Sequence, residues 1–145
     1  MEISKMIATL LTGSKLEDVH VGGGGGSIVL FDFPSASLII YSSWRLRRKK
    51  DKLLLTSCQD DASVGGVMQK ELYKIKGQCV NNLIISEFHD IIIEYENGTT
   101  FETFSDINED EYGDGENWCI SVNDDNLTYC SIANCIERFI SNKSD

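Results

Sequence analysis

The chain has 145 residues, of which 41% are hydrophobic and 25% are charged, and it contains one proline. This composition is typical of a globular protein and not of a disordered segment, and the length fits one domain over residues 1–145. No apolar run is long enough to cross a membrane and the N-terminal residues do not resemble a secretion signal, so we expect a cytoplasmic protein.

The formal net charge is −10, and the acidic residues are concentrated in the second half. From Gly77 to Glu137 there are fourteen aspartates and glutamates and no lysine or arginine. A surface of one sign costs self-repulsion, and it attracts a partner of the opposite sign. This half would repel nucleic acid, since phosphates are negative.

The five cysteines form no CxxC motif and their number is odd. We therefore predict buried thiols in a reducing compartment and no disulfide framework.

In the first half of the chain, apolar residues at helical spacing predict a short N-terminal helix over residues 2–12. Runs rich in β-branched and aromatic residues predict strands over 27–33, 37–47 and 52–57, the first two joined as a hairpin at Pro34. The polar stretch 58–70 is predicted to be a loop with a short helical turn.

In the second half, the pattern predicts a succession of short strands and a closing helix over 132–140. The predicted strands are 72–77, 80–88, 90–98, 99–106, 118–122 and 127–131. Asn97-Gly98 is the strongest hairpin signal, and Ile91, Ile93 and Tyr95 form one apolar face before it. The expected fold is α+β: a mostly antiparallel sheet with a short N-terminal helix and a C-terminal helix.

The acidic loop 106–117 partly imitates an EF-hand calcium loop. The glycine that the sharp turn needs is replaced by Glu111, and the bidentate glutamate of the last position is Asn117. We therefore predict no metal site and no cofactor, and interpret the loop as a solvated acidic segment or a contact surface.

The segment 44–52 carries six of the thirteen basic residues beside Trp44. It could touch nucleic acid, or it could be a charged hairpin tip that pairs with the acidic half or with an acidic partner. The glycine run 22–26 lacks the lysine and hydroxyl residue of a phosphate-binding loop and is interpreted as a flexible connection.

Catalytic motifs are scarce. Neither His20 nor His89 has metal-ligand spacing, and no nucleophile elbow is present. We therefore do not expect an enzyme.

Several segments together resemble small bacterial immunity proteins, the antidotes encoded beside toxins of contact-dependent inhibition and other polymorphic toxin systems. The resemblance spans about residues 38–122, and its motifs are Trp44-Arg45-Leu46, Thr56-Ser57-x-x-Asp60-Asp61, Asp90 to Gly98, Phe101 and Glu116-Asn117-Trp118. It implies a protein that binds a cognate toxin, often a nuclease, and blocks its active site or substrate cleft.

A nuclease cleft is positive because it binds phosphates, so a negative surface would be steered to it and would compete with its substrate. The alternative function is a nucleic-acid-binding module that uses residues 44–52. The predicted partner is a cationic toxin domain, with no membrane partner and no nucleic acid. The expected contact residues are Asp106, Glu109, Asp110, Glu111, Tyr112, Asp114, Glu116 and Trp118. For Trp118 the competing interpretation, packing in the core, is slightly favoured over contact.

Overall fold

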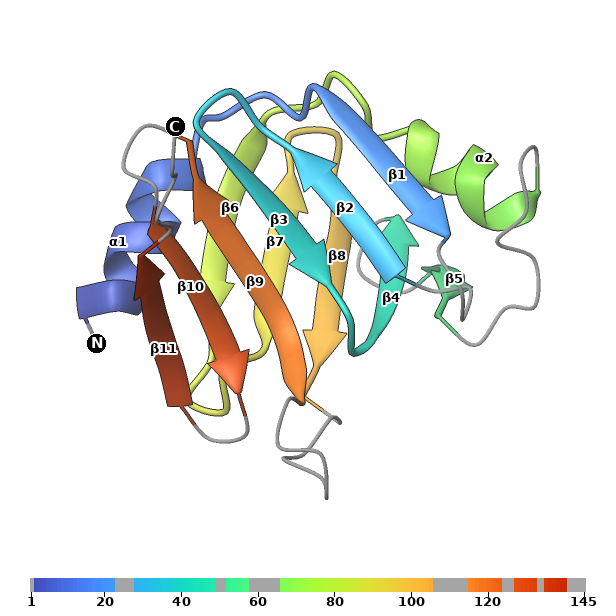
Figure 1. Cartoon of the computed structure of the whole chain (residues 1–145). Coiled ribbons are helices and arrows are strands. Elements are labelled where there is room, and N and C mark those ends of the chain that lie inside the picture. Colours follow the sequence, from blue (N-terminus) through green and yellow to red (C-terminus); the bar gives the residue numbers. More distant parts are fainter. Residues whose placement is uncertain are drawn as a thin grey trace, which may run out of the picture.

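The computed structural model describes residues 2–22, 28–48, 52–57, 66–105, 115–123, 127–132 and 135–140. They form eleven strands in two antiparallel sheets that pack face to face, with two helices beside them (Figure 1). In these residues no helix has the length and apolar character needed to cross a membrane. The mostly antiparallel sheet and the N-terminal helix confirm that part of the expected α+β fold.

The six-stranded sheet has the order β1-β2-β3-β9-β10-β11. Its strands are β1 (Asp18–Gly22), β2 (Ile28–Asp32), β3 (Ala36–Ile40), β9 (Glu116–Val122), β10 (Leu127–Ile132) and β11 (Cys135–Ile140). The sheet therefore joins strands from both ends of the chain.

The five-stranded sheet has the order β5-β4-β8-β7-β6 and is made by the middle of the chain. Its strands are β4 (Ser43–Arg48), β5 (Lys52–Thr56), β6 (Val80–Ile85), β7 (Ile91–Tyr95) and β8 (Thr99–Phe104). As predicted, Asn97-Gly98 connects β7 and β8, where Gly98 adopts a positive φ of 86° that suits glycine.

The two helices lie at opposite ends of the sandwich (Figure 1). Helix α1 (Glu2–Leu11) packs on β6 and buries Ile7 and Leu11, whereas α2 (Val67–Tyr73) packs on β1 and β5 and buries Met68 and Leu72. The helices thereby cover apolar surface where the sheets end.

The facing sides of the sheets form the core. Phe101 on β8 meets Phe31 of the other sheet edge-on, with ring centroids 4.8 Å apart, and stacks on Trp44 at 5.4 Å. All three side chains are at most 1% exposed. Trp118 is also fully buried and donates its Nε1–H to the carbonyl of His89 at 2.7 Å, which ties β9 to the β6–β7 turn.

Three predicted elements are wrong. Residues 37–47 are not one strand, because the chain crosses between the sheets at Tyr41-Ser42, whose amides both donate to the carbonyl of Asn117. Residues 72–77 belong to α2 and the turns after it, since Met68, Leu72 and Ile75 point to the core at helical spacing.

The C-terminal helix predicted over 132–140 is the third error. Cys135–Ile140 is strand β11, paired along its whole length with β10. Its apolar residues fit helical spacing over two turns only, and backbone pairing with a neighbouring strand overrides so short a pattern. Strand β1 was not predicted at all.

Replacing Phe101 with alanine should lower the free energy of unfolding by about 3–5 kcal/mol, because a cavity would open between Phe31 and Trp44. Urea unfolding followed by tryptophan fluorescence measures the change. The matched control is Phe88→Ala, since the Phe88 side chain is 71% exposed and its loss should change stability by less than about 0.5 kcal/mol. Equal effects of the two substitutions would contradict this description of the core.

Candidate interaction surface

The outer face of the six-stranded sheet is ordered by its register. Residues directly opposite each other on antiparallel strands share a face, so the pairings define rows that cross all six strands. One inward row is buried throughout its first five strands: Val19, Phe31, Leu38, Ile120 and Tyr129. The rows on either side of it must therefore point outward.

The first outward row is apolar in its four middle strands and has one ionisable residue at each end. Its members, from β1 to β11, are His20, Leu30, Ile39, Cys119, Cys130 and Glu137. The second outward row is polar until its last strand, and its members are Asp18, Asp32, Ser37, Ser121, Thr128 and Phe139.

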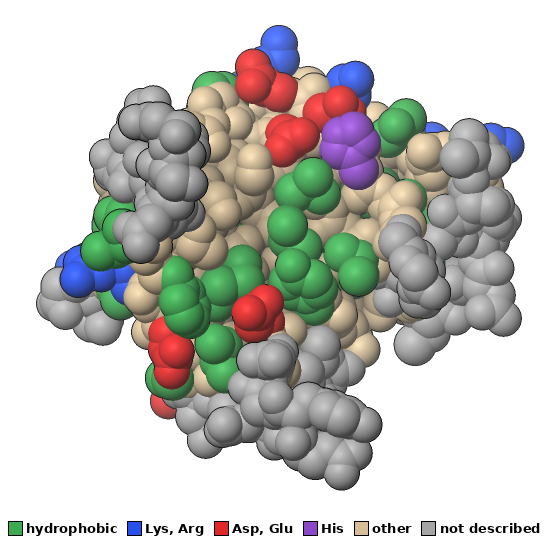
Figure 2. Space-filling model, viewed as in Figure 1, with side chains coloured by type: hydrophobic (Ala, Val, Ile, Leu, Met, Phe, Trp, Pro, Cys, Tyr) green, Lys and Arg blue, Asp and Glu red, His purple; other side chains and the backbone are tan. Residues whose placement is uncertain are grey.

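These rows form the surface that faces the viewer in Figure 2, where hydrophobic side chains gather between acidic ones. Four carboxylates belong to this outward surface: Asp18, Asp32, Glu116 and Glu137. The six strands contain a single basic residue, Arg138, which lies opposite Tyr129 in the inward register. We call this face, from β1 to β11, the acidic–apolar face.

A shallow hollow of about 290 Å³ lies at the β1–β3 end of the acidic–apolar face. It is lined by His20, Val21, Gly22, Ile28, Leu30 and Ile39. Apolar walls beside the imidazole of His20 are suited to receive a side chain that has an apolar stem and a polar end.

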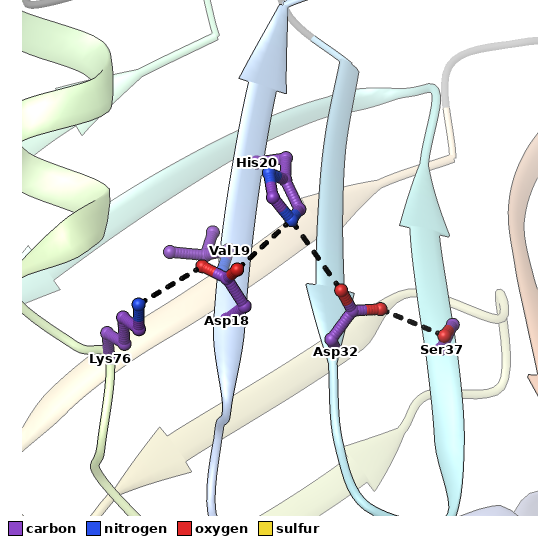
Figure 3. A network of polar contacts seen from close by, with 6 residues as sticks. All are labelled: Asp18, Val19, His20, Asp32, Ser37 and Lys76. Carbon is purple, nitrogen blue, oxygen red and sulfur yellow. Dashed lines mark hydrogen bonds and ion pairs between the residues drawn. The ribbon is translucent and has the colours of Figure 1, made fainter.

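A polar network borders this hollow (Figure 3). The Nε2 atom of His20 lies 3.3 Å from an Asp18 oxygen and 3.6 Å from an Asp32 oxygen. The Ser37 hydroxyl donates to the second Asp32 oxygen at 2.9 Å, and Lys76 lies 3.5 Å from Asp18.

The order of these groups is not that of a catalytic triad. A serine nucleophile needs its hydroxyl bonded to the histidine that will accept its proton. Here the Ser37 hydroxyl is bonded to Asp32, and both carboxylates meet the same histidine nitrogen. The network orders charge at the surface and does not activate Ser37.

The pKa of Asp18 lies below its ordinary value. The main cause is the backbone N–H of Val19, which donates to the carboxylate at 2.9 Å, and the nearby His20 and Lys76 act in the same direction. Asp18 therefore keeps its negative charge over an extended pH range.

The predicted contact residues fall into three groups. Asp106, Glu109, Asp110, Glu111, Tyr112 and Asp114 lie outside the described residues. Glu116 is half-exposed at the start of β9, opposite Ile132. Trp118 is 0% exposed and points inward, so it is a core residue in this structure and not a surface anchor.

The structure changes the prediction for the cysteines. Cys119 and Cys130 face each other on β9 and β10 and form a disulfide, with their Cα atoms 4.1 Å apart. The prediction that all five are thiols is wrong for this pair. Cys79 and Cys135 keep their thiols, and Cys58 lies outside the described residues.

Glu116, Cys119 and Cys130 place their ligand atoms within 4.8 Å of one another. Zinc requires cysteine as thiolate, and both sulfurs are consumed by the disulfide. The cluster is therefore not a metal site in the oxidised form that the structure describes.

Two basic residues of the other sheet are paired within the protein. Arg45 and Arg47 both form ion pairs with Glu102, which is 12% exposed, and Arg45 also lies over the ring of Phe104 at 4.6 Å. This agrees with the interpretation that the basic segment pairs with the protein's own acidic half. It leaves less uncompensated positive charge for nucleic acid.

A larger hollow, of about 460 Å³, lies between α1 and the β6–β7 turn. It contains both Lys5 and Glu87, so it lacks the single sign of the acidic–apolar face. His89 also lines it, with a positive φ of 65° and its carbonyl held by Trp118. The positive φ of His89 is thus explained in part by the hydrogen bond from the buried Trp118 to its carbonyl.

The acidic–apolar face could not be read from the sequence, because its rows depend on the β3–β9 and β1–β2 pairings. The signal that was available was the alternation in 28–32 and 36–40, where each strand carries apolar residues on both faces. Comparison with protein-family models, curated proteins and solved structures finds no match to this chain.

Because the pKa of Asp18 is depressed, its contribution to stability is present above the unfolded pKa of about 4 and is lost as the pH falls through the folded value. We expect the melting temperatures of the wild type and Asp18→Asn to converge as the pH falls from about 5 to below the unfolded pKa of about 4. Glu96→Gln, at an exposed position after β7, makes the matched substitution of a carboxylate by an amide and is measured for comparison. A difference for Asp18→Asn that is constant over this range would contradict the assignment.

Alkylation should distinguish the cysteine thiols from the disulfide-bonded pair. In protein purified without reductant, iodoacetamide should modify the exposed Cys135 and leave Cys119 and Cys130 unmodified until a reductant is added. Peptide mapping by mass spectrometry measures each site. Modification of Cys119 and Cys130 in the native, unreduced protein would show that they are thiols.

Proposed function

We propose that this protein is an immunity protein, which binds a cationic toxin domain and blocks its active site or substrate cleft. The observation that carries the proposal is the acidic–apolar face, where a row of apolar side chains lies among four outward carboxylates. Negative charge gives fast association with a positive cleft, and buried apolar contacts slow dissociation.

The position of the acidic segment supports this proposal. Residues 106–114 lead through Gly115 into Glu116, which is the first residue of β9 and has an outward carboxylate. In the sequence, the densest run of acids in the chain therefore directly precedes the first residue of β9. The second proposed contact region, Asp106 to Glu116, shares Glu116 with the acidic–apolar face.

In this proposal the protein acts by occlusion and needs no catalytic group or cofactor. The Asp18–His20–Asp32 network supports a binding role, because it holds two carboxylates in fixed positions beside an apolar hollow. Preorganised charges lose little entropy when a cationic partner arrives.

The test uses the basic C-terminal domain of the large secreted protein encoded directly upstream, where such a gene is present. We expect the triple variant Asp110→Lys, Glu111→Lys, Asp114→Lys to associate about tenfold more slowly at 50 mM salt, because rim charges mainly set the association rate. The control is Glu87→Lys, Glu94→Lys, Glu96→Lys, which makes the same charge change on and beside β6 and β7. Biolayer interferometry measures both rates.

The apolar part of the face has its own matched pair of variants. Leu30→Ala with Ile39→Ala should speed dissociation about tenfold, since each loses apolar area from the centre of the contact. Ile84→Ala with Ile92→Ala makes the equivalent change on the outer face of the other sheet and should have little effect. If neither the charge variant nor the apolar variant differs from wild type, the acidic–apolar face is not the interface.

A further inference from the structure

Strand β11 is an edge strand with exposed side chains. It pairs with β10 on one side, and no further strand is paired with it in the described part of the chain (Figure 1). Phe139 is 43% exposed and Ile140 is 67% exposed. The other three edge strands, β1, β5 and β6, have a helix packed against them. An open, apolar edge is a template for an added strand.

The register shows which backbone groups face the open side. The Cα atoms of Cys119 and Cys130 are 4.1 Å apart, which is the short spacing of a pair that does not exchange hydrogen bonds. The backbone of Cys130 therefore bonds towards β11, at its partner Glu137. By alternation, the amides and carbonyls of Ile136, Arg138 and Ile140 point away from β10 to the open edge.

A second copy of this chain is a poor occupant of that edge. Antiparallel pairing of two β11 strands keeps each face of the sheet continuous, so opposed residues must lie on the same face. Two registers give the greatest overlap. In one, Glu137 lies opposite Glu137 of the second copy, and in the other, Arg138 lies opposite Arg138 of the second copy. Like charges directly opposite each other destabilise a strand pair.

We propose that β11 is a docking strand for an extended segment of the partner protein, which adds to the six-stranded sheet in antiparallel orientation. The favoured segment has a basic residue opposite Glu137 and an acidic residue opposite Arg138. It has apolar residues opposite Ile136 and Phe139. Backbone hydrogen bonds supply affinity and this side-chain pattern supplies the register.

This inference rests on the proposed function, because it assigns the added strand to the same cationic partner. The geometry is continuous with the acidic–apolar face: Glu137 ends its apolar row and Phe139 ends its polar row. A strand added at β11 would extend both rows by one residue. A partner that covers the face can thus also pair with its edge.

The first probe is a synthetic peptide with the core Val-Ile-Glu-Lys-Val-Thr, which places its glutamate opposite Arg138 and its lysine opposite Glu137. At millimolar peptide we expect amide hydrogen exchange at Ile136 and Arg138 to slow severalfold, measured by NMR. The control exchanges the two charged residues, Val-Ile-Lys-Glu-Val-Thr, and should bind about tenfold more weakly. Equal protection by both peptides, or protection by neither, would overturn the proposed edge.

The second probe compares two variants at one position. Arg138→Pro removes an outward amide hydrogen and should prevent strand addition, while pairing with β10 is kept. Arg138→Ala removes the same side chain and keeps the amide, so it should bind the peptide to within about threefold of wild type. If circular dichroism shows that Arg138→Pro does not fold, the comparison of the two peptides on the wild-type protein tests whether β11 is the docking strand.

The same variants separate this inference from the proposed function. A toxin domain that binds Arg138→Pro as tightly as Arg138→Ala would overturn docking at β11 and leave the immunity role intact. Charge-dependent peptide protection at β11, together with no binding of the toxin domain, would leave the docking strand and remove the immunity role. Analytical ultracentrifugation showing a dimer that Arg138→Pro abolishes would identify a second copy as the occupant and overturn the proposal.

Discussion

The contact between the two sheets is the constraint on which the other features depend. Phe101 fills the space between Phe31 and Trp44, and rows of apolar side chains on both sheets close around it. Because the side chains of a strand alternate, burying one row fixes the direction of the next. The orientation of Leu30 and Ile39 towards solvent is therefore a consequence of burying Phe31 and Leu38. The acidic–apolar face is the solvent-facing side of the same sheet whose inner side forms the core.

The two outer faces handle charge differently. On the five-stranded sheet, Glu102 lies between Arg45 and Arg47 and neutralises part of their charge. On the six-stranded sheet, Asp18 and Asp32 share one histidine, and Arg138, which belongs to the inward register, is the single lysine or arginine of the strands that carry Glu116 and Glu137. An asymmetric field of this kind orients an approaching cationic molecule before contact.

Local patterns predicted much of the fold. The helix over 2–12 and the strands around Pro34 and Asn97-Gly98 were found because their periodicity and turn residues act over a few positions. The errors lie where the pairing between elements decides and the pattern within one element does not. Residues 135–140 have helical spacing but pair with β10, and the crossing at Tyr41-Ser42 depends on the carbonyl of Asn117. The disulfide was missed for the same reason, since Cys119 and Cys130 become opposite each other through the β9–β10 register.

The pairing of β3 with β9 has a consequence for how this protein is made. It joins Ala36 to Val122. The five strands of the other sheet lie between β3 and β9 in the sequence, so they are synthesised before β9 can pair with β3. Pairings of such large sequence separation form late and slowly. The apolar row crosses this junction between Ile39 and Cys119. Until β3 pairs with β9, the two halves of the acidic–apolar face are therefore separate, and the complete face marks a molecule that has finished folding.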